Sequence, residues 1–189
     1  MTASDAVLVE APDFAGVIEA WRVWRVVAGK DGYTLGSVIK PTLWPPREPL
    51  VAECLCSSPV VTWFRRRRSP HEIPDERCEC GIYAASLPTV GQYLRDPPAN
   101  LAVARVLGQV SLWGRVVECE RGYRASHAYP LRLFVPVDSS VHRRHRWRAL
   151  VHGLDAYGVP VEALPARCAE AARVLEREQL ASSRHADGL

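Results

Sequence analysis

The sequence predicts an α+β protein with a mainly antiparallel β-sheet, a cysteine-rich metal knuckle and C-terminal helices. Runs of β-branched and aromatic residues separated by turn residues indicate strands in the first two thirds of the chain. An amphipathic helical spacing of apolar residues starts near residue 147, and two Cys-x-Cys pairs lie between the predicted strands. The 189 residues are 48% hydrophobic and 24% charged, which suits one folded domain.

The first predicted strands form a hairpin. Residues 17–27 are rich in valine and tryptophan, and the turn from Gly29 to Gly32 leads to a partner strand at 33–43. Three prolines within 44–49 exclude regular strand pairing there.

A second hairpin follows the cysteine region. Residues 106–117 alternate between apolar and polar side chains, as in a half-buried strand. Gly122 turns the chain into a return strand at 123–136, which Pro130 is expected to interrupt. Two short helices are expected before this hairpin, at 89–94 and 100–105.

The C-terminal part is predicted to be mostly helical. Apolar residues recur at helical spacing in 147–157, and Gly158 suits the position after a helix end. We expect a short strand at 159–164. The predicted organisation is a flexible leader at 1–12, a single α+β domain at 13–164 with a metal-binding insert at about 50–85, a C-terminal helix at 165–181 and a disordered tail at 182–189.

Composition and charge indicate a cytoplasmic protein. The opening residues lack the basic and apolar regions of a signal peptide, and no apolar stretch is long enough to span a bilayer. In a reducing compartment, clustered cysteines indicate metal or redox chemistry. The net charge is only +3 and nearly all cations are arginine, which a GC-rich genome explains as well as anion recognition does.

The candidate metal ligands are four cysteines and one histidine: Cys54, Cys56, His71, Cys78 and Cys80. Alternate residues of an extended segment point to the same side, so two adjacent Cys-x-Cys segments bring their thiols together. Zinc takes four ligands, either four cysteines or three with a histidine. We predict Cys54, His71, Cys78 and Cys80, with Cys56 as the alternate ligand because the Ser-Ser-Pro that follows it leads away from the site.

Other interpretations of these cysteines stay open. The four paired cysteines could hold an iron–sulfur cluster, form a reversible disulfide within one Cys-x-Cys, or pack as small apolar groups. Cys119 and Cys168 stand apart and are interpreted as packing residues. A zinc site filled by four protein ligands leaves no place for water, so the predicted role is structural.

An arginine-rich run lies inside the same region: Trp63, Phe64, Arg65, Arg66, Arg67 and Arg68. Arginine beside aromatic residues is typical of surfaces that contact phosphates and stack bases. The run therefore predicts a nucleic-acid or acidic-protein partner, although a solvated loop explains it equally well. A second basic group at 142–148 contains His142 and His145, which could also bind metal.

Enzymatic activity is not assigned by any motif. The chain contains no dinucleotide-binding, Walker A or nucleophile-elbow sequence. Ser126, His127 and Tyr129 lie near Glu118 and Glu120 on the second hairpin, without the order of a catalytic triad. A non-enzymatic binding module is favoured, and an enzyme with an unfamiliar site near His127 stays open.

Two sequence blocks resemble a known group of proteins. The first is an H-x-x-P-x₃-C-x-C-G-I-Y-A block from His71 to Ala84, and the second is a G-x-V-x-L-W-G strand from Gly108 to Gly114. They resemble short uncharacterised bacterial proteins, largely actinobacterial, over about residues 15–165. The resemblance implies that Cys54, in its Ala-x-Cys element, is a ligand in preference to Cys56. It implies no activity.

Overall fold

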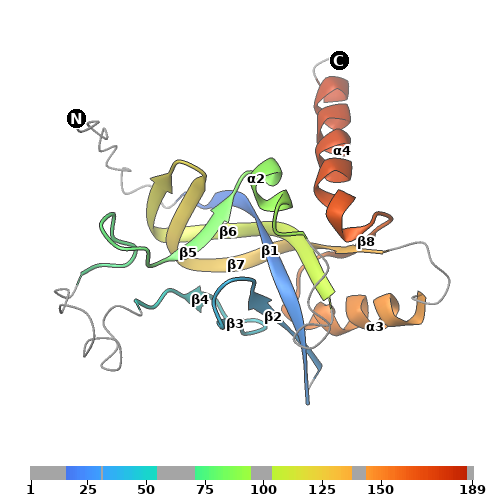
Figure 1. Cartoon of the computed structure of the whole chain (residues 1–189), viewed down its shortest axis with the longest axis horizontal. Coiled ribbons are helices and arrows are strands. Elements are labelled where there is room, and N and C mark those ends of the chain that lie inside the picture. Colours follow the sequence, from blue (N-terminus) through green and yellow to red (C-terminus); the bar gives the residue numbers. More distant parts are fainter. Residues whose placement is uncertain (1–15, 31, 55–70, 95–103, 138–143, 187–189) are drawn as a thin grey trace.

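The computed structural model describes residues 16–30, 32–54, 71–94, 104–137 and 144–186. These residues form an eight-stranded sheet, almost entirely antiparallel, with helices on both of its faces (Figure 1). The predicted α+β class is therefore confirmed. No helix within the described ranges is long and apolar enough to cross a membrane.

The first hairpin is formed by β1 (Ile18–Gly29) and β2 (Gly32–Ser37). The partner strand is shorter than predicted, because the backbone N–H of Ser37 donates to the carbonyl of Thr42 at 2.8 Å and closes a loop. Pairing resumes in β3 (Leu43–Trp44), which lies antiparallel to β2.

The second hairpin joins β6 (Ala104–Cys119) to β7 (Gly122–Pro136). The expected helix at 100–105 is wrong at its last two positions, since Ala104 already pairs with Val26 of β1; positions 100–103 lie outside the described residues. Pro130 does not interrupt β7 as predicted. It lies opposite Val110, next to a register shift after Gln109, where the ladder tolerates a residue without an N–H.

The remaining strands join the sheet through β7. Strands β4 (Leu50–Val51) and β5 (Ile82–Ala85) are antiparallel to it, and β8 (Val161–Leu164) is parallel. Strand β5 also reaches β1 through the pair of Ala85 with Trp21. Strand β1 pairs with β6, β6 pairs with β7, β7 pairs with β5, and β5 pairs again with β1. These four strands therefore form a closed ring of pairings.

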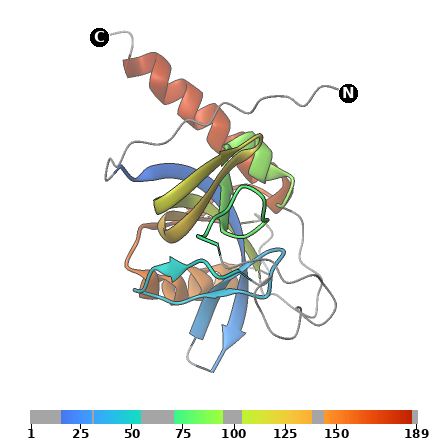
Figure 2. The same ribbon diagram turned by 90° about the vertical axis from the view of Figure 1, so that its left-hand side faces the viewer.

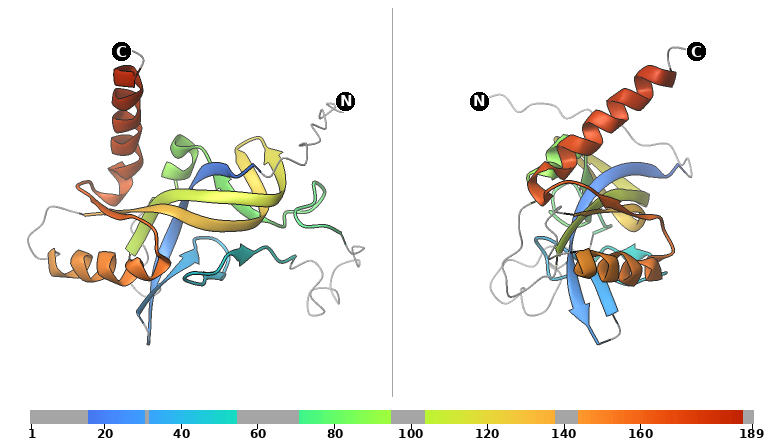
Figure 3. Two further views of the ribbon diagram at one scale, coloured as in Figure 1. Left: turned by 180° about the vertical axis from the view of Figure 1, so that it is seen from behind. Right: turned by 90° about the vertical axis from the view of Figure 1, so that its right-hand side faces the viewer.

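Apolar side chains are buried on both faces of the sheet, which makes two cores. Along β1, Trp24 belongs to one core and Trp21 to the other, as expected for residues of opposite parity. Helix α3 (Arg144–Leu154) covers the first core, whereas α2 (Leu87–Gly91) and α4 (Ala171–Ala186) cover the second (Figure 3).

The C-terminal helices differ from prediction at their ends. A 3-10 turn (Asp155–Tyr157) extends α3, and Gly158 follows with the expected left-handed φ of 66°. The last helix begins at Ala171, after a second 3-10 turn (Cys168–Glu170), and not at residue 165. It continues to Ala186, through part of the segment expected to be disordered.

Candidate metal centre

Strand β7 aligns the two segments that carry the cysteines. Leu50 and Val51 of β4 pair with Ala128 and His127, and the backbone N–H of the next residue, Ala52, donates to the carbonyl of Ser126 at 2.8 Å. Strand β5 pairs with the neighbouring stretch of β7, from Gly122 to Ala125. The chain just after β4 and just before β5 therefore meets on one side of the sheet, which faces the viewer in Figure 2.

Cys54, His71, Cys78 and Cys80 form a group that could hold a metal ion, because their ligand atoms all lie within 4.8 Å of one another. The sulfurs of Cys54 and Cys78 are 3.6 Å apart, and Cys80 Sγ lies 3.4 Å from His71 Nε2. A tetrahedral zinc ion with bonds of about 2.3 Å to sulfur and 2.0 Å to nitrogen sets such pairs about 3.8 and 3.5 Å apart. The donor set and its spacing thus fit a single tetrahedral ion.

The thiols are crowded in a buried place. Cys78 and Cys80 are buried, and Cys54 is half-buried. Burial raises the pKa of the Cys80 thiol, and Cys78 and Cys54 raise it further, while a hydrogen bond with the backbone of Asp75 lowers it. Several thiolates at this spacing repel one another without a positive ion, which explains why a divalent cation suits the group.

Arg124 of β7 organises the backbone around the ligands. Its side chain is buried, and its Nη1 donates to the carbonyl oxygens of Asp75 at 3.1 Å, of Cys80 at 3.2 Å and of Cys78. Its Nε donates to Cys119 Sγ at 3.2 Å. One cation from the sheet therefore holds the loop at three points, two of which are ligand residues.

A second arginine, on β6, holds the beginning of the same loop. Arg115 Nε donates to the carbonyl of Pro74 at 2.9 Å, and its guanidinium pairs with Glu72 next to His71. The ion pair is solvent-exposed and contributes little by itself, but the bond to the Pro74 backbone fixes the path of the loop.

Gly81 connects the last ligand to β5. Its φ is +112°, a conformation that favours glycine. A Cβ here would lie 3.0 Å from the Cβ of Pro74 and 3.2 Å from that of Arg124. Glycine thus allows the chain to leave Cys80 and pack closely against Arg124.

No family model, curated protein or solved structure matches this chain.

The four predicted ligands come together, but other predicted site residues are not described. Cys56 and the run Trp63, Phe64, Arg65, Arg66, Arg67 and Arg68 lie outside the described residues, as do His142 and the side chain of His145. Cys119 does more than pack, because it accepts the hydrogen bond from Arg124.

Sequence reasoning missed Arg124 and Arg115, the two residues that support the loop. Both come from strands remote in sequence, 49 and 41 positions from the loop residues they bind. The sequence carries only a weak signal for Arg124, an arginine within the Gly-Tyr-Arg-Ala element that begins β7.

The second hairpin holds a Ser–His contact. Ser126 Oγ lies 2.9 Å from His127 Nδ1, and the His127 ring stacks on Trp113 with 5.9 Å between centroids. Ser126 Oγ also accepts from the backbone N–H of Arg115 at 3.0 Å. The bond from Arg115 ties Ser126 to the irregular stretch of β6 between Trp113 and Val116, which is a structural use of its hydroxyl.

Proposed function

We propose that this chain is a zinc-stabilised binding module that presents an arginine-rich loop to nucleic acid. One observation carries the proposal: segment 55–70 begins directly after Cys54 and ends directly before His71, and both residues belong to the ligand group. A single ion bound by Cys54 and His71 would join the two ends of this segment. The run from Trp63 to Arg68 lies inside it.

Zinc is the proposed ion. Three thiols and one imidazole are a common structural zinc set, and all four tetrahedral places are then filled by protein. An iron–sulfur cluster distributes its cysteines over several irons, whereas these ligand atoms gather within the space of one ion. A filled coordination sphere favours a structural role over Lewis-acid catalysis.

Nucleic acid is the proposed partner because the run combines phosphate-binding and base-stacking side chains. Arginine forks match phosphate oxygens, and Trp63 and Phe64 offer faces for unpaired bases. A metal-closed loop has less conformational freedom to lose on binding, which strengthens its affinity.

The test measures anisotropy of a fluorescein-labelled single-stranded oligonucleotide across a series of salt concentrations. Replacing Arg65, Arg66, Arg67 and Arg68 by glutamine should weaken binding and lower the slope of log K against log salt by about 3, since each phosphate contact contributes about 0.7. The matched control replaces exposed arginines elsewhere, Arg148, Arg167, Arg173 and Arg177. Removing the metal with a chelator should weaken binding about tenfold.

Binding that is insensitive to salt, or is weakened equally by both arginine variants, contradicts the proposal. If polyglutamate binds through Arg65 to Arg68 and the oligonucleotide does not, the partner is an acidic protein. A brown protein with visible absorption, purified without oxygen, would identify an iron–sulfur protein instead.

A further inference from the structure

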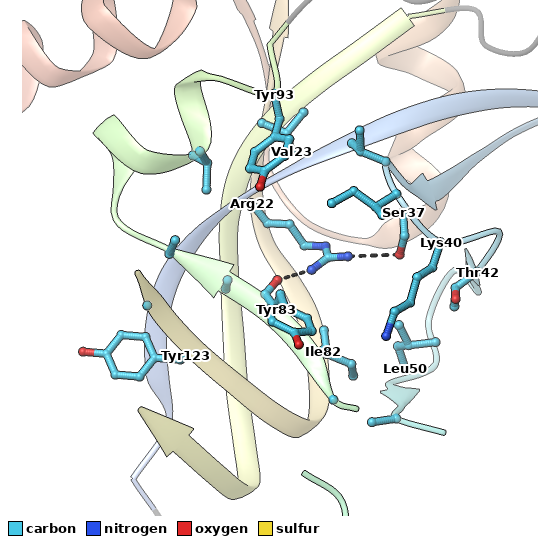
Figure 4. Close-up of a pocket in the computed structure, with 18 of the residues that line it drawn as sticks. Arg22, Val23, Ser37, Lys40, Thr42, Leu50, Ile82, Tyr83, Tyr93 and Tyr123 are labelled. Carbon is cyan, nitrogen blue, oxygen red and sulfur yellow. Dashed lines mark hydrogen bonds between the residues drawn. The ribbon is translucent and has the colours of Figure 1, made fainter. Parts of the chain in front are cut away.

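A pocket of about 680 Å³ lies between β1, the loop after β2, and β5 (Figure 4). This volume is in the range of cavities that bind small organic molecules. Seven large apolar side chains are exposed among the described residues, and five of them line this pocket: Ile39, Leu43, Val51, Tyr83 and Tyr93. Exposed apolar surface is thus concentrated here, as at a ligand-binding site.

Arg22 of β1 lies in the middle of this apolar lining (Figure 4). Its Nη2 donates to Ser37 Oγ at 3.0 Å, and its Nη1 donates to the carbonyl of Tyr83. Its Nε is buried and has no hydrogen-bond partner. The guanidinium also lies over the ring of Trp44, 5.0 Å from its centroid.

The positive charge of Arg22 has no counter-ion in the described structure. The ion pairs found there are Arg115–Glu72, Arg132–Glu162 and His152–Asp155, and none involves Arg22. Partial removal of this guanidinium from water lowers the pKa of Arg22 to about 10. Arg22 is half-buried, and a partly desolvated cation without an anion is unfavourable, so an anion that enters the pocket is stabilised there.

A second cation reaches the same pocket. Lys40 lies over the ring of Tyr83 with its Nζ 5.6 Å from the centroid, and it donates to the carbonyl of Glu79 at 3.4 Å. The carboxylates on the lining, Glu53 and Glu79, are solvent-exposed and neither pairs with Arg22.

We infer that this pocket binds a small organic acid, whose carboxylate pairs with Arg22 and whose apolar body lies against the tyrosine and aliphatic side chains of the lining. A guanidinium has five N–H donors, and the bonds to Tyr83 and Ser37 occupy two of those of Arg22. A carboxylate accepts two parallel bonds from such a fork and carries one charge. Inorganic phosphate has no apolar body to cover the rest of this lining, whereas an organic acid does.

The test titrates the whole zinc-loaded protein with 4-phenylbutyrate and with decanoate, using calorimetry and quenching of tryptophan fluorescence, since Trp21 lines the pocket. We expect one site per chain and a Kd below about 1 mM for at least one acid. The neutral amide of that acid should bind with an affinity at least about tenfold lower, because it lacks the negative charge that pairs with Arg22. Inorganic phosphate should not compete.

Arg22→Met is the informative variant. It should weaken binding of the acid about tenfold or more, while its thermal stability stays equal or rises because a half-buried charge without a counter-ion is removed. Lys40→Met should weaken binding less. Equal binding of acid and amide, effective competition by phosphate, or absence of saturable binding by both acids would overturn the inference. None of these results depends on the oligonucleotide experiment, so the two proposals fail separately.

Discussion

The sulfur atoms of Cys54 and Cys78 lie 3.6 Å apart although 24 positions separate the two residues in the chain. Neither residue is in a strand; each is placed by a strand beside it that pairs with β7. The sheet therefore brings the two thiols to a spacing that fits two ligands of one tetrahedral ion.

Loss of a ligand should lower both metal content and stability. Cys54→Ser and His71→Ala should each reduce bound zinc well below one equivalent and destabilise the fold by several kcal/mol, because metal binding is coupled to folding. Elemental analysis and thermal unfolding measure both effects. Cys168→Ser is the matched control, with zinc unchanged. Full metal in Cys54→Ser but not in Cys56→Ser would identify Cys56 as the ligand.

Arg124→Met should weaken the metal site without touching a ligand. It leaves the carbonyls of Cys78 and Cys80 without their donor, so we expect zinc affinity to fall about 10- to 100-fold. Competition with a coloured chelator measures the affinity. Arg121→Met, an exposed change on the same hairpin, should leave it unchanged. Equal affinities in the two variants would show that Arg124 does not position the loop.

Gly81→Ala should be more destabilising than Gly32→Ala. Both glycines have similar positive φ values, +112° and +122°, but a Cβ at Gly32 meets nothing within 4 Å. The Gly32 variant therefore measures backbone strain alone, about 1 kcal/mol, and Gly81→Ala adds crowding against Pro74 and Arg124. Chemical denaturation of the zinc-loaded variants compares them. Equal losses of stability in the two variants would show that Pro74 and Arg124 accommodate the added methyl group without destabilising the fold.

Tyr157→Phe should be destabilising by an amount that depends on pH. The Tyr157 hydroxyl donates to the carbonyl of Trp44 at 2.6 Å and accepts from the N–H of Leu35 at 2.7 Å, so its loss should cost about 1–3 kcal/mol at pH 8. Burial raises the pKa of Tyr157 to about 12, against about 10 when unfolded.

Between about pH 10 and pH 12 the folded state therefore retains the phenol proton of Tyr157, which the unfolded state has released. The advantage of the wild type over Tyr157→Phe is full below about pH 10 and declines as the pH rises toward 12. Urea denaturation followed by tryptophan fluorescence at pH 8, 9.5 and 11 tests this. A difference that is constant or grows with pH would contradict it.

The strands and the ligand types were predictable because both have local signals. Alternation in 106–117 reflects burial of Val106, Val110 and Leu112 in one core, and Cys-x-Cys spacing is visible without any fold. The same alternation gave no indication that Leu107 is buried in a second core, because that core depends on α2 and α4 covering the opposite face.

The contacts of Arg124 with the ligand loop were not predictable, because they too depend on segments that are remote in sequence. Arg124 contacts the loop only because β5 pairs with β7, and this pairing joins residues about forty positions apart. The helix expected at 100–105 is wrong at positions 104 and 105, because pairing of Ala104 with Val26 overrides the local preference. The pocket around Arg22 likewise depends on segments that are remote in sequence and meet only in the folded sheet.

The pairing of β4 with β7 involves only two residues, yet it determines which side of the sheet Cys54 faces. A slip of one residue would turn Cys54 away from Cys78 and Cys80, because side chains alternate along a strand. The pairing of two residues contributes too little free energy to exclude the shifted register by itself. A metal ion held by Cys54, Cys78 and Cys80 would stabilise only the correct register of β4, and would thereby select that register over the shifted one.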